Sequence, residues 1–285
     1  MFMLPDDTQW KGKTLYELYG EAYTPWDWQP RLKDIANALW LDLFSSPFDF
    51  TAVDFLAKMD VPAYKVASFE MLDTPLVQRM ARTGKPLIMS TGMATLAEIA
   101  EAVDAARGAG CRDLVLLKCT SAYPARPEDM NLAAMALLGE AFGTVVGLSD
   151  HTLGNEAAIA AVALGASVIE KHFTLARADG GPDAEFSLEP AEFESLVRSI
   201  RIVEKAIGEK RFAPTGGEAG NRRFRRSLFV TRDVRAGERF TEHNVRSVRP
   251  GSGLPPRHYD EVLGRRATRD VPANTPLDWH MIGDS

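Results

Sequence analysis

The chain has few cysteines and no long apolar run, and both shortages exclude classes of protein. Cys111 and Cys119 are the only two cysteines among 285 residues, whereas a disulfide-stapled scaffold contains many more. Because Cys119 lies in an apolar, strand-like run, we expect two reduced thiols in a cytoplasmic protein. No stretch contains about eighteen uninterrupted apolar residues, and the first residues lack a basic region followed by a long apolar one. We therefore expect neither secretion nor a membrane span.

An excess of basic residues is also lacking. The formal net charge of -6 argues against nucleic acid as the main partner. The short cluster Arg222, Arg223, Arg225 and Arg226 is better interpreted as a solvated linker or an anion contact. With 45% hydrophobic and 25% charged residues, the chain has enough apolar side chains for a full globular core.

Strand-like and helix-like segments alternate through most of the chain. This alternation predicts a parallel α/β architecture in which helices cross over between neighbouring strands. We expect strands at residues 41–46, 63–68, 86–91, 114–120, 145–149 and 168–173. We expect helices at residues 49–59, 75–83, 96–108, 132–142, 155–164 and 190–207.

A glycine-rich nucleotide loop is also missing from the sequence. An open doubly wound sheet normally carries one after its first strand, but Thr91-Gly92 and Gly180-Gly181 match only turns. The sequence therefore favours a (β/α)8 TIM-type barrel, here with about six of its eight strands. Such a barrel places the polar residues that end its strands on one catalytic face.

Two of these strand ends carry a histidine. The motif GLSDHT at residues 147–152 and the motif IEKHFT at residues 169–174 are separated by an alanine-rich helical stretch, so the two strands lie side by side and the histidines at one end of the sheet. A single strand-end histidine is more often a structural hydrogen-bonding residue. The pair His151 and His172, with Ser149, Asp150, Glu170 and Lys171 alongside, predicts a metal site.

The composition changes after residue 207. Residues 208–223 are rich in glycine and have little periodicity, which is typical of a linker. Residues 224–285 alternate short apolar runs with turns and predict a small β-rich domain. A domain of this size is marginal alone, so we expect it to pack on its own barrel or on a neighbouring subunit.

Several motifs, in order along the chain, resemble the sialic acid synthase family. They are YKVASFE at 64–70, STGMAT at 90–95, KCTSAYP at 118–124 and the two histidine motifs. Within the family, TLYELY at 14–19, AYTPW at 22–26, DGGPD at 179–183 and FSLEP at 186–190 look most like the pseudaminic acid synthases. Residues 1–207 resemble the synthase barrel, and residues 224–285 resemble the antifreeze-like (SAF) domain of the same family.

The resemblance implies a condensation of phosphoenolpyruvate with 2,4-diacetamido-2,4,6-trideoxy-altrose, giving pseudaminic acid and inorganic phosphate. It implies His151 and His172 as ligands of a divalent cation, Mn2+ or Mg2+, whereas imidazole ligation alone suits zinc, iron or nickel equally well. His151, His172, Lys65 and Glu70 are then the catalytic residues. The implied homodimer places each SAF domain over the partner's active site.

The implied substrate contacts divide into two groups. Lys65, Ser46, Ser68, Ser90, Ser121 and Ser149 match the positions that bind phosphoenolpyruvate. Even without the family, a lysine in an apolar strand needs an anion nearby, while a serine at a strand end often only caps a helix. Glu70, Tyr123 and Asp183 match the sugar contacts, with a salt bridge between Glu70 and Lys65 as the alternative. Arg249 matches the SAF arginine that contacts an acyl group, or is a turn-flanking surface residue.

Members of the family begin with two further barrel strands, which carry a glutamate and a Lys-x-Gln-like motif, and the sequence given starts after both. Three hypotheses follow. The first is a pseudaminic acid synthase, and the second is a synthase that takes N-acetylmannosamine or a legionaminic acid precursor. The third is a non-catalytic remnant that binds sugar or phosphoenolpyruvate.

Overall fold

The computed structural model describes residues 2–4 and 11–284. The chain divides into two compact units, Met1–Gly208 and Glu209–Ser285, and each is described by itself below. Among the described residues, no helix is both long and apolar enough to cross a membrane.

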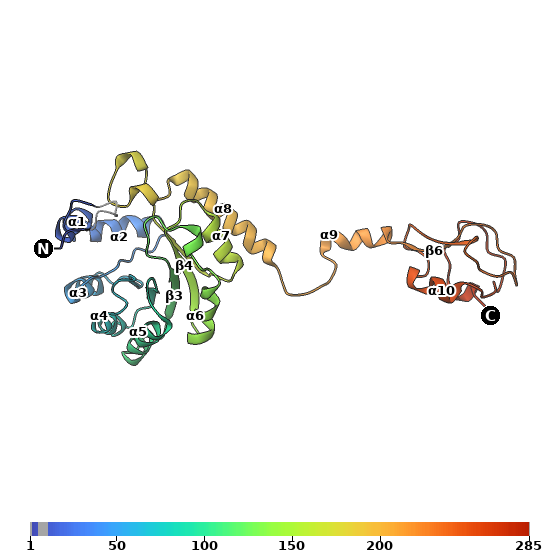
Figure 1. Cartoon of the computed structure of the whole chain (residues 1–285), viewed down its shortest axis with the longest axis horizontal. Helices are drawn as coiled ribbons and strands as arrows, with labels where there is room; N and C mark the ends of the chain where they lie inside the picture. The colour runs from blue at the N-terminus through green and yellow to red at the C-terminus, as the bar shows by residue number, and fades with distance from the viewer. Residues whose placement is uncertain (1, 5–10, 285) are drawn as a thin grey trace. The chain divides into compact units, whose positions relative to one another are not determined.

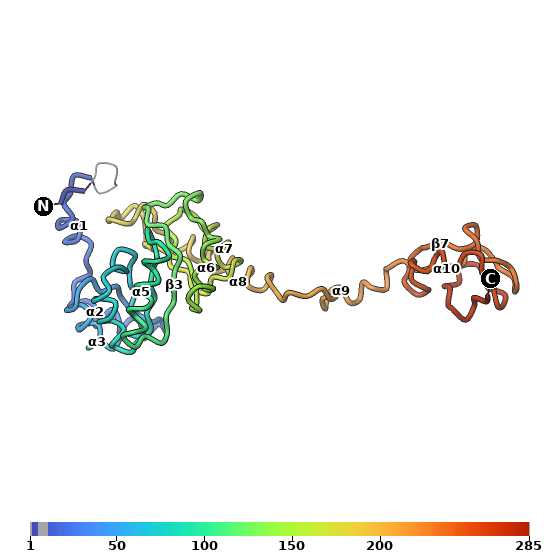
Figure 2. Tube along the Cα trace, turned by 60° about the horizontal axis from the view of Figure 1, so that its bottom comes forward, coloured from blue at the N-terminus to red at the C-terminus, as the bar shows by residue number. Residues whose placement is uncertain are grey.

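The first unit is built on a curled parallel sheet (Figures 1 and 2). Its described strands follow one another in sequence order, and each pair of neighbours is parallel. The carboxyl ends of all the strands therefore meet at one edge, as the α/β prediction requires. The strands are β1 (Tyr64–Val66), β2 (Leu87–Ser90), β3 (Leu114–Cys119), β4 (Val145–Asp150) and β5 (Val168–Lys171).

Helices connect these strands and lie along the outer side of the curl (Figure 1). Local signals set where they begin: the Asp49 side chain caps α3, Asp73 caps α4, and Thr95 with Glu98 forms a capping box on α5. Gly143, with a φ of 60°, ends α6 in the left-handed conformation. The helices are α3 (Phe50–Lys58), α4 (Thr74–Ala81), α5 (Leu96–Gly108), α6 (Ala134–Phe142), α7 (Glu156–Ala163) and α8 (Pro190–Ile207).

The strand expected at residues 41–46 is reduced to one bridge. Ser45 pairs in parallel with Tyr64, and its carbonyl accepts the Lys65 N–H at 3.2 Å. Leu41 is exposed, so an apolar run alone did not make a strand here, because a ladder needs a bonded neighbour along its length. Two helices precede this segment, α1 (Leu15–Ala22) and α2 (Gln29–Ala38).

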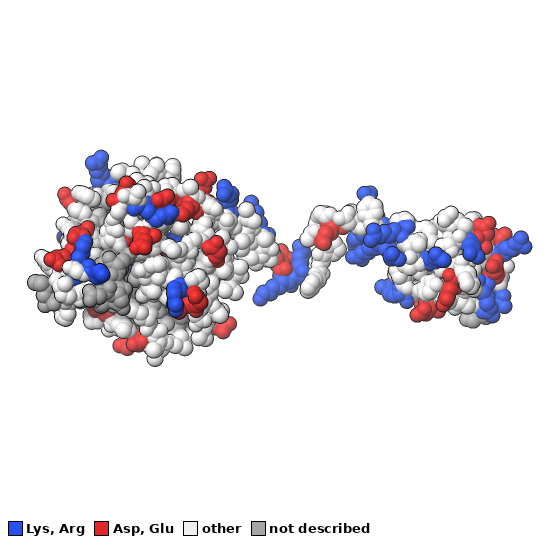
Figure 3. All heavy atoms as spheres, turned by 45° about the horizontal axis from the view of Figure 1, so that its top comes forward, with Lys and Arg blue, Asp and Glu red and all other residues white. Residues whose placement is uncertain are grey.

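The main core lies between the sheet and helices α3 to α6. Leu87, Met89 and Leu116 from the strands are fully buried against Leu76 and Val103 from the helices. This core fixes the backbone of the strands, so the residues at their carboxyl ends project from a rigid support. Acidic and basic side chains are interspersed on the face of this unit that Figure 3 presents.

The second unit has its own core. The antiparallel strands β6 (Ser227–Val230) and β7 (Val245–Val248) pair in register, and isolated antiparallel bridges extend the network. Leu228, Val230, Phe240 and Val245 are fully buried within it. The helices of this unit are α9 (Gly216–Ala219), inside the glycine-rich segment expected as a linker, and α10 (Tyr259–Val262).

Candidate functional site

A cavity opens at the carboxyl ends of the parallel strands. Its volume is about 350 Å³, in the range of small-molecule sites. Because all five strands of the described sheet end at this edge, the cavity collects the polar side chains that follow them. Its lining is Ser46, Lys65, Ala67, Ser68, Ser90, Cys119, Tyr123, Ser149, His151, Glu170, Lys171 and His172.

Lys65 supplies a buried positive charge. The residue is 8% exposed, and its Nζ donates to Ser90 Oγ at 2.8 Å and to the Val66 carbonyl at 2.9 Å. Burial lowers the pKa of Lys65, and the carboxylate of Glu170, with Oε2 3.7 Å from Nζ, partly opposes that shift. An anion bound in the cavity would compensate the ammonium further.

Glu70 is therefore not the carboxylate that pairs with Lys65 in this structure, and the salt-bridge alternative for Glu70 gives way to Glu170. Ser149 Oγ donates to Glu170 Oε1 at 2.6 Å. Sequence reasoning noted Glu170 beside the histidine but did not place it in the site. The available signal was strand alternation, since residues two apart, such as Glu170 and His172, face the same side of a strand.

Two further hydroxyl groups meet beside Gly92. The Gly92 N–H donates to Ser68 Oγ at 3.1 Å, and a Cβ at residue 92 would lie 2.2 Å from Ser121 Oγ. Ser121 is thus adjacent to the cavity although it is not part of its lining. Gly92, which the sequence indicated only as a turn, brings together the loops after β1, β2 and β3.

The two histidines lie side by side, with ring centroids 5.2 Å apart. His151 Nδ1 is 2.9 Å from the Thr120 carbonyl, so this nitrogen donates and leaves Nε2 with a free lone pair. Burial lowers the pKa of His151, but the contacts with Cys119 and Thr120 outweigh it and the net shift is upward. Burial lowers the pKa of His172 despite nearby Asp183.

This histidine pair fits a catalytic divalent cation. The described residues contain no group of three or more His, Cys, Asp or Glu side chains arranged for a metal ion. Two imidazoles, one of them oriented by a backbone carbonyl, leave the remaining ligand positions to water and substrate oxygens. The donor set suits a catalytic ion and not a closed structural one.

Tyr123 and Cys119 complete the wall beside the histidines. The Tyr123 ring lies 4.4 Å from that of His151, and burial raises its pKa to about 12, so the phenol keeps its proton. Burial also raises the pKa of the Cys119 thiol, but hydrogen bonds led by that to His151 outweigh it and bring the pKa to about 7. Both cysteines are free and buried.

Glu70 lies in the turn after β1 and is not part of the cavity lining. Burial raises its pKa, and a hydrogen bond to its own backbone and the Lys65 charge only partly offset that rise. Its Oε2 is buried and lacks a hydrogen-bond partner among the described residues. Such an atom is unfavourable unless a ligand satisfies it.

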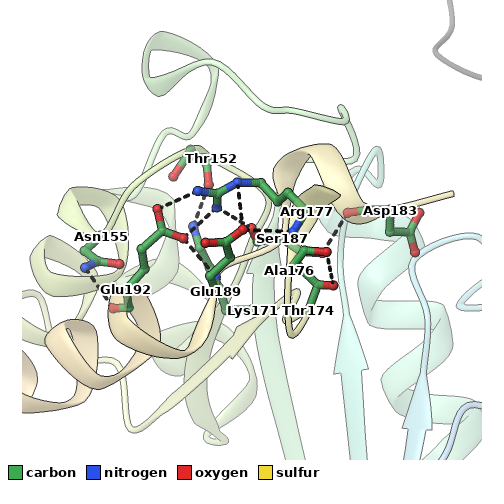
Figure 4. A network of polar contacts seen from close by, with 10 residues as sticks. All are labelled: Thr152, Asn155, Lys171, Thr174, Ala176, Arg177, Asp183, Ser187, Glu189 and Glu192. Atoms are coloured by element: carbon green, nitrogen blue, oxygen red, sulfur yellow. Dashed lines mark hydrogen bonds and ion pairs between the residues drawn. The ribbon is translucent and has the colours of Figure 1, made fainter. Parts of the chain in front are cut away.

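Asp183 belongs to the loop between β5 and α8, and its Oδ2 lies 3.6 Å from His172 Nδ1. Figure 4 shows how this loop is held: Arg177 donates to both oxygens of Glu192, at 2.6 and 3.0 Å, and to the Ser187 carbonyl. Ser187 Oγ in turn donates to the Asp183 carbonyl at 2.7 Å. The loop that carries Asp183 is therefore anchored to the start of α8.

Arg249 is exposed and follows β7 in the second unit.

The cavity of the first unit gathers most of the predicted site residues. It is lined by Lys65, Ser46, Ser68, Ser90, Ser149, Tyr123, His151 and His172, and Ser121, Glu70 and Asp183 lie next to its lining residues. A buried cation among hydroxyls can hold a phosphate or carboxylate. Beside it, two imidazoles can hold a Lewis acid against a second substrate.

The fold and this site define an enzyme of the α/β-barrel type with its chemistry at the strand ends. Protein-family models match residues 3–212 to the NeuB family and residues 225–283 to the SAF domain. The chain belongs to the NeuB family, and the resemblance to sialic acid synthases with a SAF domain is confirmed.

The chain is also similar to individual synthases of this family. The pseudaminic acid synthase of Helicobacter pylori is 46% identical over 95% of this chain and 80% of its own length. The N,N'-diacetyllegionaminic acid synthase of Campylobacter jejuni is 42% identical over 79% of this chain and 69% of its own length. A crystal structure of the N-acetylneuraminic acid synthetase of Leptospira borgpetersenii matches with a TM-score of 0.68 and 32% identity, covering 72% of each chain.

Proposed function

We propose that the chain condenses phosphoenolpyruvate with 2,4-diacetamido-2,4,6-trideoxy-altrose to give pseudaminic acid and inorganic phosphate. One observation carries the proposal: a buried lysine among serine hydroxyls shares a cavity with two adjacent histidines. The identity to a named pseudaminic acid synthase selects this sugar over the legionaminic acid precursor and N-acetylmannosamine.

Lys65 and the hydroxyls bind phosphoenolpyruvate in this proposal. The ammonium and Ser46, Ser68, Ser90, Ser121 and Ser149 would hold the phosphate and the carboxylate, because charge-assisted hydrogen bonds to such anions are strong. A bond then forms between the methylene carbon of phosphoenolpyruvate and the aldehyde carbon of the sugar, and the aldehyde oxygen receives the carbonyl electron pair and the proton that the added water releases. Water adds at the carbon that bears the phosphate, and inorganic phosphate leaves.

The sugar is assigned to the histidine side of the cavity. Tyr123, protonated at neutral pH, would donate a hydrogen bond, and Asp183 would accept one from a hydroxyl or acetamido group. The buried Glu70 carboxyl, whose pKa is raised by burial, would accept a hydrogen bond from the substrate or orient water.

His151 and His172 would hold a divalent cation, Mn2+ or Mg2+, and His151 would do so through Nε2 because Nδ1 donates to Thr120. A bound cation of this kind polarises the aldehyde as a Lewis acid.

The assembly we propose is a cytoplasmic homodimer in which Arg249 of each SAF domain contacts the acyl group of the sugar bound by the other subunit. The two buried free thiols support a reducing compartment.

Phosphate release by the purified chain tests the function. The reaction contains phosphoenolpyruvate, Mn2+ and 2,4-diacetamido-2,4,6-trideoxy-altrose, with His172→Ala as the control and a legionaminic acid precursor and N-acetylmannosamine as competing sugars. We expect metal-dependent release with the altrose derivative that the control loses. Faster turnover of another sugar would show that the chain is a synthase for that sugar instead. Binding without turnover would support a non-catalytic role.

A further inference from the structure

A buried ion pair joins the last residues of β4 and β5. Lys171 Nζ lies 2.7 Å from Asp150 Oδ2, and the two side chains are 1% and 0% exposed. Lys171 is part of the cavity lining, although its side chain is almost fully buried. Neither charge takes part in the chemistry proposed above.

Thr152 completes this network. Its N–H and its Oγ1 donate to Asp150 Oδ1 at 2.9 and 2.8 Å, and Lys171 Nζ donates to the Thr152 carbonyl at 2.5 Å. Figure 4 shows Lys171 directed at Thr152. The residues on both sides of His151 are thereby tied to Lys171, which directly precedes His172.

The position of the pair along the ladder matters for the histidines. The paired register of β4 and β5 ends at Asp150 and Lys171, so His151 and His172 lie one residue beyond the last rung. The histidine carbonyls accept hydrogen bonds from residues outside this strand pair: His151 from the Ala125 N–H and His172 from the Leu188 N–H. At this level, Asp150 and Lys171 link the two strands that carry the histidines.

Burying two charges is costly, and well-packed apolar residues often stabilise a fold as much or more. A purely structural pair would therefore bring little benefit at this place. A charge-assisted bond does, however, fix a distance more tightly than apolar contacts do.

We propose that Asp150 and Lys171 are positioning residues that hold His151 and His172 at the separation a shared divalent cation needs. The proposal rests on the proposed function, in which the two histidines bind such an ion. The pair acts through the backbone of the histidines and touches neither ion nor substrate.

Mn2+ affinity, measured on the metal-free 285-residue chain by the electron paramagnetic resonance signal of the free ion, tests this role. Asp150→Asn and Lys171→Met each break the pair, and the double variant removes both charges without leaving either unpaired. Leu76→Ala, in α4 and remote from the histidines, is a control that destabilises the fold by a cavity alone. Circular dichroism and thermal unfolding establish which variants fold.

We expect the folded pair variants to bind Mn2+ about tenfold more weakly or worse, as is usual when groups that orient metal ligands are lost. Leu76→Ala should stay within twofold of wild type. A folded double variant with wild-type affinity would overturn the positioning role of Asp150 and Lys171 but not the proposed metal site. His172→Ala, which lacks one proposed ligand, shows the affinity expected without the metal site. If the wild-type chain bound Mn2+ no better than this variant, the proposed metal site and this inference would both be overturned.

Discussion

Lys65 carries its charge where burial disfavours it. Its pKa is lowered, first by desolvation, so the unfolded chain binds this proton more tightly than the folded one. The charge therefore reduces stability at neutral pH, and stability rises as the pH rises through the folded-state pKa. The phosphoenolpyruvate anion that we propose Lys65 binds would offset this cost.

Lys65→Met should therefore separate binding from stability. We expect the KM for phosphoenolpyruvate to rise by about 10- to 100-fold, because a hydrogen-bonded charge contact is lost, with an unfolding temperature no lower than that of wild type. Lys118→Met is the matched control: Lys118 lies half-buried on β3, its pKa is also lowered by burial, and it donates to Cys119 and Thr120. Steady-state kinetics measure KM, and calorimetry measures the unfolding temperature. Equal KM values for the two variants would refute the role of Lys65.

Among the elements, β4 and β5 approach each other at Gly147. A Cβ at this position would lie 2.2 Å from the Val168 carbonyl and 2.7 Å from Leu117 Cδ2. The carbonyl is part of the ladder and cannot move without disturbing the register. Glycine is required here by close approach and not by a special φ.

Gly147→Ala should destabilise the chain by about 1–3 kcal/mol or more, as overpacking does. Gly139→Ala, in α6, is its control: the nearest atom to the new Cβ is Val146 Cγ1 at 3.4 Å, and the better helix propensity of alanine should add about 0.5–1 kcal/mol. Denaturant unfolding measures both. Equal effects of the two substitutions would contradict the close approach of the strands.

The loop that carries Asp183 depends on Arg177 and Glu192. The hydrogen bond from Arg177 holds the pKa of Glu192 at about 2. Because the folded pKa is below the ordinary value of 4.5, this stabilisation is complete above pH 4.5 and is lost as the pH falls toward 2. Both side chains are partly exposed, so the solvent keeps the contribution to global stability small.

Arg177→Ala should release the loop locally. We expect faster hydrogen exchange at residues 174–189 at neutral pH and a higher KM for the sugar. For Glu192→Gln, the difference in unfolding temperature from wild type should become smaller below pH 4.5. Arg201→Ala removes a similar exposed pair with Glu204 on the same helix and should change neither exchange in the loop nor KM. Unchanged exchange in Arg177→Ala would show that the loop is held by other contacts.

At the scale of the whole molecule, the proposed homodimer predicts that Arg249 acts on the active site of the partner subunit and not on that of its own chain. His172→Ala and Arg249→Ala should each be nearly inactive with the proposed sugar. In a twofold-symmetric dimer with exchanged SAF domains, half of a random mixture is heterodimer, and each heterodimer contains one intact site. Co-refolded chains should therefore recover about a quarter of wild-type phosphate release, whereas action within one chain predicts no recovery.

Local sequence patterns were enough to predict much of the fold. The helix at residues 96–108 follows from the Thr95 capping box and apolar spacing, and the alternation of segments implied parallel strands with polar residues at one edge. Periodicity and caps act over a few residues, so they can be read from the chain. The histidine pair was predicted for the same reason, because one crossover places consecutive parallel strands side by side.

Tertiary structure decided what depends on register and depth. It reduced residues 41–46 to one bridge, paired Lys65 with Glu170 and not with Glu70, and made Gly92 the point where three loops meet. It also buried Asp150 and Lys171 together, each directly before one of the histidines. These contacts join residues from different strands, and their distances are set by the packing of the whole sheet against its helices, which no local pattern records.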